Sequence, residues 1–209
     1  DGRMASAHVF FDDRWRPVEH SKRYYKVLPA AGVNASISDM KRWLLAQLGL
    51  IDGFTKEQLD TLQNRYIVSD RDGGHYPEDA RIQQVGYGLG WRTFSFSGLS
   101  GFAHHGGYVR GMRSEMVFHR RLRSGMVFLT NSEPSKLNEI SLFFAGWLAA
   151  REKFYSELKV ALRLPSIRVH MRRVKMQSRI CLEQSPCTIR KFIRVATNFV
   201  DRPTNTSFW

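Results

Sequence analysis

The stretch 102–131, FAHHGGYVRGMRSEMVFHRRLRSGMVFLTN, decides how the rest of the chain is placed. Two apolar runs, residues 114–118 and 126–130, carry the β-branched and aromatic residues that favour strands. The two runs are separated by a basic turn, expected to be exposed, that contains His119, Arg120, Arg121 and Arg123, and Ser124-Gly125 supplies a flexible corner between them. The pattern therefore predicts an antiparallel hairpin, preceded by another corner at His105-Gly106-Gly107.

Apolar residues at helical spacing surround this hairpin in the sequence. Three segments combine that spacing with an N-terminal cap: residues 40–48 after Ser36 or Ser38, residues 56–65 after a Thr55–Gln58 capping box, and residues 133–164 after Ser132. A strand is predicted over residues 87–96. Residues 1–26 are predicted to be loop with one short strand at 8–11.

Three segments, in order, resemble one family. Residues 28–36, LPAAGVNAS, followed by Asp39-Met40 and an apolar helix, resemble its P-A-G-G-L-x-S-x-x-D-M segment. Residues 87–91, YGLGW, resemble its Y-G-L-G-W strand, and His105-Gly106-Gly107 followed by Gly111 resembles its third motif, Lys-Thr-Gly or His-x-Gly. The family is the serine β-lactamase and penicillin-binding-protein superfamily, in its class C-like branch of esterases, D-amino-acid peptidases and lactamases.

This resemblance implies an α+β fold in which an antiparallel sheet is flanked by helices. Residues 1–164 would form the C-terminal, sheet-side portion of a β-lactamase-like serine hydrolase domain, so that the fold is incomplete. Residues 165–209 would be a basic tail of uncertain structure. A bacterial periplasmic or envelope location is implied by the family, and no signal peptide is visible in the chain.

The resemblance also implies a site along the third motif. His105 would be catalytic and would line the substrate site, and the main-chain N–H of Tyr108 would belong to the oxyanion hole. Gly106, Gly107, Arg110 and Gly111 would contact substrate. An imidazole that is neutral at pH 7 in place of a fixed Lys charge favours esterase or peptidase chemistry over β-lactam hydrolysis. The family implies neither a metal nor an organic cofactor.

The other parts of the acyl-transfer machinery are not evident in the sequence. A nucleophilic Ser with a Lys one helical turn later is required. The pairs Ser38–Lys41 and Ser156–Lys159 have that spacing, but two fixed positions in four arise by chance. Ser38 also lies in a segment that matches a non-catalytic part of the family. No Tyr-x-Asn or Ser-x-Asn occurs. We therefore expect the nucleophile upstream of this chain, and little or no turnover from the chain alone.

The composition leaves a second function class open. Hydrophobic residues at 43% and charged residues at 24% are typical of a globular protein, and no run approaches the ~20 apolar residues of a membrane span. The net charge is +13, and residues 165–209 carry nine basic against two acidic residues. This tail could bind nucleic acid or an anionic membrane, although it lacks a nucleic-acid-binding motif. It could equally be a misread segment, and the protein could be a catalytically dead homologue used for protein interaction.

Cys181 and Cys187, both in the tail, would form a local disulfide or remain free thiols, and a zinc site is not expected.

Overall fold

The computed structural model describes residues 4–27, 32–69, 76–134 and 138–161. The basic tail and its two cysteines lie outside these ranges, as does Pro165, the predicted end of the last helix. No helix in the described part is long and apolar enough to cross a membrane.

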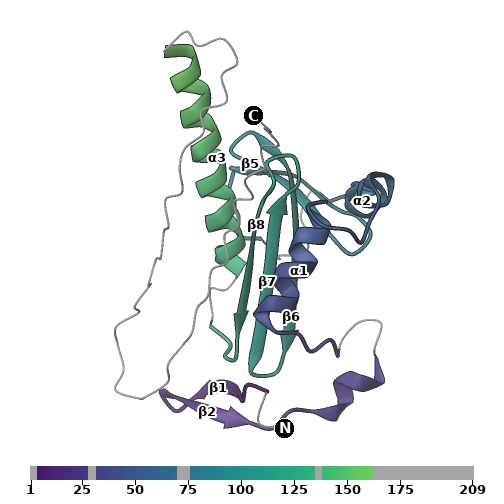
Figure 1. The fold of residues 1–209 in the computed structure, drawn as a ribbon. Helices are drawn as coiled ribbons and strands as arrows, with labels where there is room; N and C mark the ends of the chain where they lie inside the picture. The colour runs from purple at the N-terminus through teal and green to yellow at the C-terminus, as the bar shows by residue number, and fades with distance from the viewer. Residues whose placement is uncertain (1–3, 28–31, 70–75, 135–137, 162–209) are drawn as a thin grey trace, which may run out of the picture.

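The described residues form eight strands, three α-helices and one 3-10 helix (Figure 1). The strands are β1 (Ala7–Phe11), β2 (Arg14–Val18), β3 (Ile67–Val68), β4 (Ile82–Tyr87), β5 (Arg92–Phe96), β6 (Leu99–Val109), β7 (Met112–His119) and β8 (Ser124–Thr130). The helices are η1 (Lys22–Lys26), α1 (Ile37–Gln47), α2 (Lys56–Gln63) and α3 (Asn138–Ala161).

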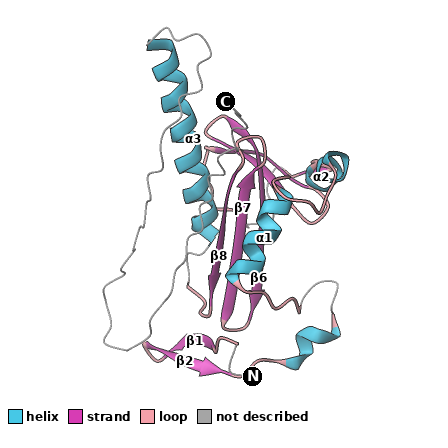
Figure 2. Cartoon of the chain, viewed as in Figure 1, coloured by secondary structure: helices cyan, strands magenta, loops and turns pink. Residues whose placement is uncertain are grey.

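Strands β3 to β8 form one antiparallel sheet in which every strand pairs with its neighbour in the sequence. Strands β1 and β2 form a separate hairpin near one end of this sheet (Figure 2). The predicted mixed α+β fold with an antiparallel sheet flanked by helices is confirmed.

The two faces of the sheet bury different clusters, because side chains alternate along each strand. Phe102, Val117 and Met126 point to the face covered by α3, where they pack with Leu142, Phe144 and Leu148, among others. Ala103, Met116, Phe118 and Val127 point to the opposite face, where they pack with Leu44 of α1 and with Leu48 at its C-cap. We refer to these as the α3 face and the α1 face.

The central hairpin and the caps of the first two helices are confirmed. Strands β7 and β8 pair in register from Arg113↔Thr130 to His119↔Ser124. The corner predicted at Ser124-Gly125 is wrong, because both residues begin β8 and the turn lies at residues 120–123. Ser36 caps α1 and exchanges hydrogen bonds with Asp39, and Thr55 does the same for α2 with Gln58. These local signals were correct because each needs only residues three positions apart.

The glycine-rich corner predicted at His105-Gly106-Gly107 is wrong. These residues lie in the middle of β6, and none of them has a positive φ. The single strand predicted over residues 87–96 is also wrong. It consists of the end of β4, a turn and β5, with the Gly88 N–H donating to the Trp91 carbonyl at 2.7 Å and Gly90 at φ +82°. Glycine permits that turn, so the motif bends the chain instead of extending it.

Three further predictions need correction. Residues 1–26 contain two strands, because Asp12 and Asp13 adopt positive φ angles suited to a two-residue hairpin turn. Ser132 does not cap the last helix, because Ser132 is buried against Thr130, Glu133 bonds to the β6–β7 turn and residues 133–134 are not helical; the described part of α3 is Asn138–Ala161. His119 was expected on an exposed basic turn, but it is buried and its Nε2 donates to the Ser100 carbonyl at 2.8 Å.

Candidate functional site

One half of β6 is a strand edge that no described strand covers. Strand β5 pairs with β6 from Leu99 to His104, whereas β7 pairs with it from Phe102 to Val109. Over His105 to Val109, therefore, β6 pairs with β7 on one side, and no described strand continues β5 along the other side. We call this stretch the β6 edge.

The register predicts which main-chain groups face outward from the β6 edge. Val109 and Met112 pair across a two-residue turn at Arg110-Gly111, a geometry in which the flanking residues bond to each other. Hydrogen-bonded and non-bonded pairs alternate along an antiparallel ladder. We therefore expect Val109, Gly107 and His105 to bond to β7, whereas Tyr108 and Gly106 direct their N–H and C=O groups away from it.

His105 stands on the α1 face of the β6 edge. It pairs with Met116, and its ring lies edge-on to that of Trp91, with 6.1 Å between the ring centroids. The side chain remains exposed, yet partial burial lowers the pKa of His105 below its usual value, and the nearby charge of Arg92 lowers it further. The imidazole is therefore mainly neutral at pH 7, where it can both donate and accept a hydrogen bond.

Gly106 and Gly107 leave space for side chains of β7. A Cβ atom on Gly106 would lie 2.9 Å from Glu115 Oε1, and one on Gly107 would collide with the Ser114 hydroxyl. Neither glycine lies in a turn, which was one alternative for this pair. Their packing against β7 is a structural reason for glycine that the sequence did not reveal, and their contact with substrate stays a prediction.

A buried polar cluster lies directly behind the β6 edge, on the α3 face. His104 is 0% exposed and Glu115 is 2% exposed, and His104 Nε2 lies 2.5 Å from Glu115 Oε2. His104 Nδ1 lies 2.9 Å from the Tyr76 hydroxyl, and the Ser141 hydroxyl of α3 donates to Glu115 Oε2 at 3.4 Å. An ionised carboxylate only accepts, so His104 Nε2 donates to it. We call this group the His104–Glu115 cluster.

The remaining predicted site residues do not converge on His105. The Tyr108 side chain is exposed, its hydroxyl donates to Glu133, and the Arg113 guanidinium lies over its ring at 5.2 Å. Arg110 is exposed in the β6–β7 turn. Gly111, at φ +79°, packs against the β1–β2 hairpin, where a Cβ atom would lie 2.8 Å from the Ala7 Cβ. Thus Gly111 has a structural role in docking that hairpin.

Three members of the two serine–lysine pairs, Ser38, Lys41 and Ser156, occupy solvent-exposed helix positions. Ser38 and Lys41 are both exposed in the first turns of α1. Ser156 is exposed on α3. Within the described residues, no group of three or more His, Cys, Asp or Glu side chains is placed to hold a metal ion.

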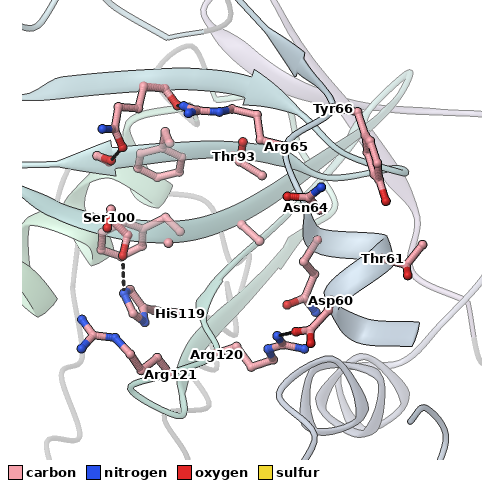
Figure 3. Close-up of a pocket in the computed structure, with 17 residues that line it drawn as sticks. Asp60, Thr61, Asn64, Arg65, Tyr66, Thr93, Ser100, His119, Arg120 and Arg121 are labelled. Carbon is pink, nitrogen blue, oxygen red and sulfur yellow. Dashed lines mark hydrogen bonds and ion pairs between the residues drawn. The ribbon is translucent and has the colours of Figure 1, made fainter. Parts of the chain in front are cut away.

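A separate cavity of about 760 Å³ opens near the other end of β6 (Figure 3). Its walls come from α2 and the segment that follows it, from Gln84 of β4, from the middle of β5 and the first half of β6, and from the end of β7 and the β7–β8 turn. Sequence reasoning missed this cavity because its walls lie up to 61 positions apart, from Asp60 to Arg121.

The comparison with known families agrees with the fold. The beta-lactamase family model matches residues 2–150, and the chain belongs to this family. It is therefore a member of a serine hydrolase superfamily. No curated protein matches the chain.

Proposed function

We propose that this chain forms the sheet side of an acyl-transfer site in a serine hydrolase that cleaves an ester, amide or β-lactam bond. The observation that carries the proposal is the β6 edge, along which no described strand continues β5, beside a mainly neutral imidazole and within residues that resemble the family's third motif.

The β6 edge supplies two features that acyl transfer needs. Attack on the carbonyl creates an oxyanion, and a main-chain N–H held rigidly in a sheet stabilises it without rearrangement. The register gives that orientation to the Tyr108 N–H. Gly106, facing the same way, offers an N–H and a C=O along which an extended substrate can align as an added strand.

His105 would act on the substrate through a hydrogen bond. It lies three positions before Tyr108 in β6, on the α1 face, and Trp91 limits the directions in which its ring can turn. A neutral imidazole can donate to a substrate carbonyl or carboxylate and can accept from a leaving group. The attacking Ser and its Lys would come from sequence outside this chain, and no cofactor is required.

The first test is a burst assay on the chain. With nitrocefin and with p-nitrophenyl acetate, we expect no stoichiometric burst, and S38A and S156A should leave any slow background hydrolysis unchanged. A burst that S38A or S156A abolishes would contradict the placement of the nucleophile outside the chain.

The second test maps binding by amide NMR, which does not depend on turnover. Titration with N-acetyl-D-alanyl-D-alanine, and separately with nitrocefin, should shift the amide signals of Gly106 and Tyr108, and H105A should weaken this binding. H20A removes an exposed histidine elsewhere and is the matched control. If neither compound gives saturable shifts at the β6 edge, or if H20A weakens them as much as H105A, the proposal fails.

A further inference from the structure

The cavity shown in Figure 3 is distinct from the β6 edge. Its walls include Thr93 and Ala103, which pair across β5 and β6. Two residues from Thr93 toward the β6 edge, just before β5, lies Trp91, whose ring packs against His105 and Phe118. Trp91 therefore stands between the two sites, and a ligand of this cavity would not touch His105.

Arg65 is held in the cavity wall by features of β4. A Cβ atom on Gly86 would lie 2.5 Å from Arg65 Cγ, so that the glycine leaves room for the arginine side chain. The Arg65 Nη1 donates to the Gln84 carbonyl at 2.7 Å. Gln84 has φ +53° where the β4–β5 register shifts, and such bulges often re-aim groups beside functional sites. Strain of this kind persists only where the surroundings maintain it.

Two more arginines line the opposite wall. Arg120 pairs with Asp60 of α2, and Asp60 also accepts from Lys56 at 2.8 Å. Arg121 is exposed beside them on the β7–β8 turn. In Figure 3, Arg65 lies along one wall, whereas Arg120 and Arg121 lie along the other.

The cavity carries net positive charge in its described lining. Three arginines face one aspartate, and no lysine or glutamate is among the lining residues. The remaining titratable imidazole, His119, is buried, with Nε2 donating to the Ser100 carbonyl and Nδ1 accepting from the Leu122 N–H at 3.3 Å. Only the neutral ring makes both bonds. Burial lowers the pKa of His119, in agreement with that state.

We propose that this cavity binds a small polar anion through a phosphate or carboxylate group, held between Arg65 and the Arg120–Arg121 wall. Guanidinium groups recognise both oxyanions through paired N–H donors, and Arg65 is already oriented by its bond to Gln84. The hydroxyl and amide groups of Thr61, Asn64 and Ser100 supply further donors and acceptors for the body of a polar ligand. A volume of about 760 Å³ suits a small metabolite.

The test is isothermal titration calorimetry of the full chain in 150 mM NaCl, with inorganic pyrophosphate in one arm and citrate in the other. We expect saturable 1:1 binding of at least one probe, and the probe that binds identifies the anionic group. R65Q and R121Q should each weaken this binding fivefold or more. The control R123Q removes an exposed arginine of the same turn that does not line the cavity, and it should change binding less than twofold.

Two results would overturn the proposal. Failure of both probes to bind saturably would mean that the arginines do not form a site. Equal weakening by R123Q and R121Q would show only general attraction to a chain of net charge +13. Arg121 is exposed, so that R121Q should not disturb folding. R121Q therefore tests the proposal even if R65Q fails to fold. H105A should leave binding unchanged, which separates this site from the proposed acyl-transfer edge.

Discussion

Removal of the Glu115 carboxylate is predicted to destabilise the fold strongly. Glu115 is 2% exposed and His104 is 0% exposed, so that neither group can turn to water when its partner is lost. In E115A the Nε2 donor of His104 and the Ser141 hydroxyl lose their acceptor in a dry region between the sheet and α3. Breaking a buried pair in this way costs about 3–5 kcal/mol. That is a large fraction of the ~5–15 kcal/mol that holds a typical domain folded.

The assay is urea denaturation followed by tryptophan fluorescence, with variants that separate charge from shape. E115Q keeps the volume and an acceptor oxygen, and it should cost about 1–3 kcal/mol, the contribution of a hydrogen bond to a charged group. The double variant H104L/E115L should cost less than the sum of its single variants by about 1–3 kcal/mol, because it leaves no orphaned partner. E78A removes an exposed carboxylate and should stay within about 0.5 kcal/mol of the unsubstituted chain.

This reasoning would be refuted by a small effect. If E115A costs less than about 1 kcal/mol, the carboxylate is hydrated and the His104–Glu115 cluster does not tie β6, β7 and α3 together. Strict additivity of H104L and E115L would lead to the same conclusion, since it would show that the two side chains do not interact.

Two further predictions concern a glycine and a histidine. Gly111 and Gly98 have nearly equal positive φ angles, but only Gly111 is crowded by the β1–β2 hairpin, so that G98A should cost about 1 kcal/mol and G111A clearly more. Equal losses in urea denaturation would show that Ala7 and His8 do not pack on that turn. His119 has a lowered pKa when folded, so the unfolded chain binds its proton first, and stability should fall as the pH drops below about 6.5. H119Q should show a shallower fall between pH 7.5 and 5 than the unsubstituted chain, and an unchanged slope would mean that His119 is not held neutral.

Local signals in the sequence were sufficient for much of the fold. The two capping boxes depend on residues three positions apart, and the β7–β8 hairpin depends on short apolar runs joined by a turn. The roles of several glycines were predicted wrongly, because a glycine can either permit a turn or make room for a neighbouring side chain. Gly88 and Gly90 serve a turn, whereas Gly106 and Gly107 make room for side chains of β7.

The site was harder to predict because it depends on register. The sequence pointed to His105 through its motif, but the role of Glu115 follows only when Val109 pairs with Met112, which places Glu115 opposite Gly106. A lone glutamate inside an apolar strand was a signal that was present and not used. Tyr76 and Ser141 reach the same cluster from 28 and 26 positions away, respectively, and no local pattern indicates such contacts.

The central claim, that β6 beyond His104 is a substrate edge on the side away from β7, is tested most directly by amide hydrogen exchange along β6. The account predicts slow exchange at His105 and Gly107, which bond to β7, and fast exchange at Gly106. Saturating N-acetyl-D-alanyl-D-alanine should then slow Gly106. Equal protection of Gly106 and its two neighbours in the free chain would show that the edge is covered and would contradict the proposed site.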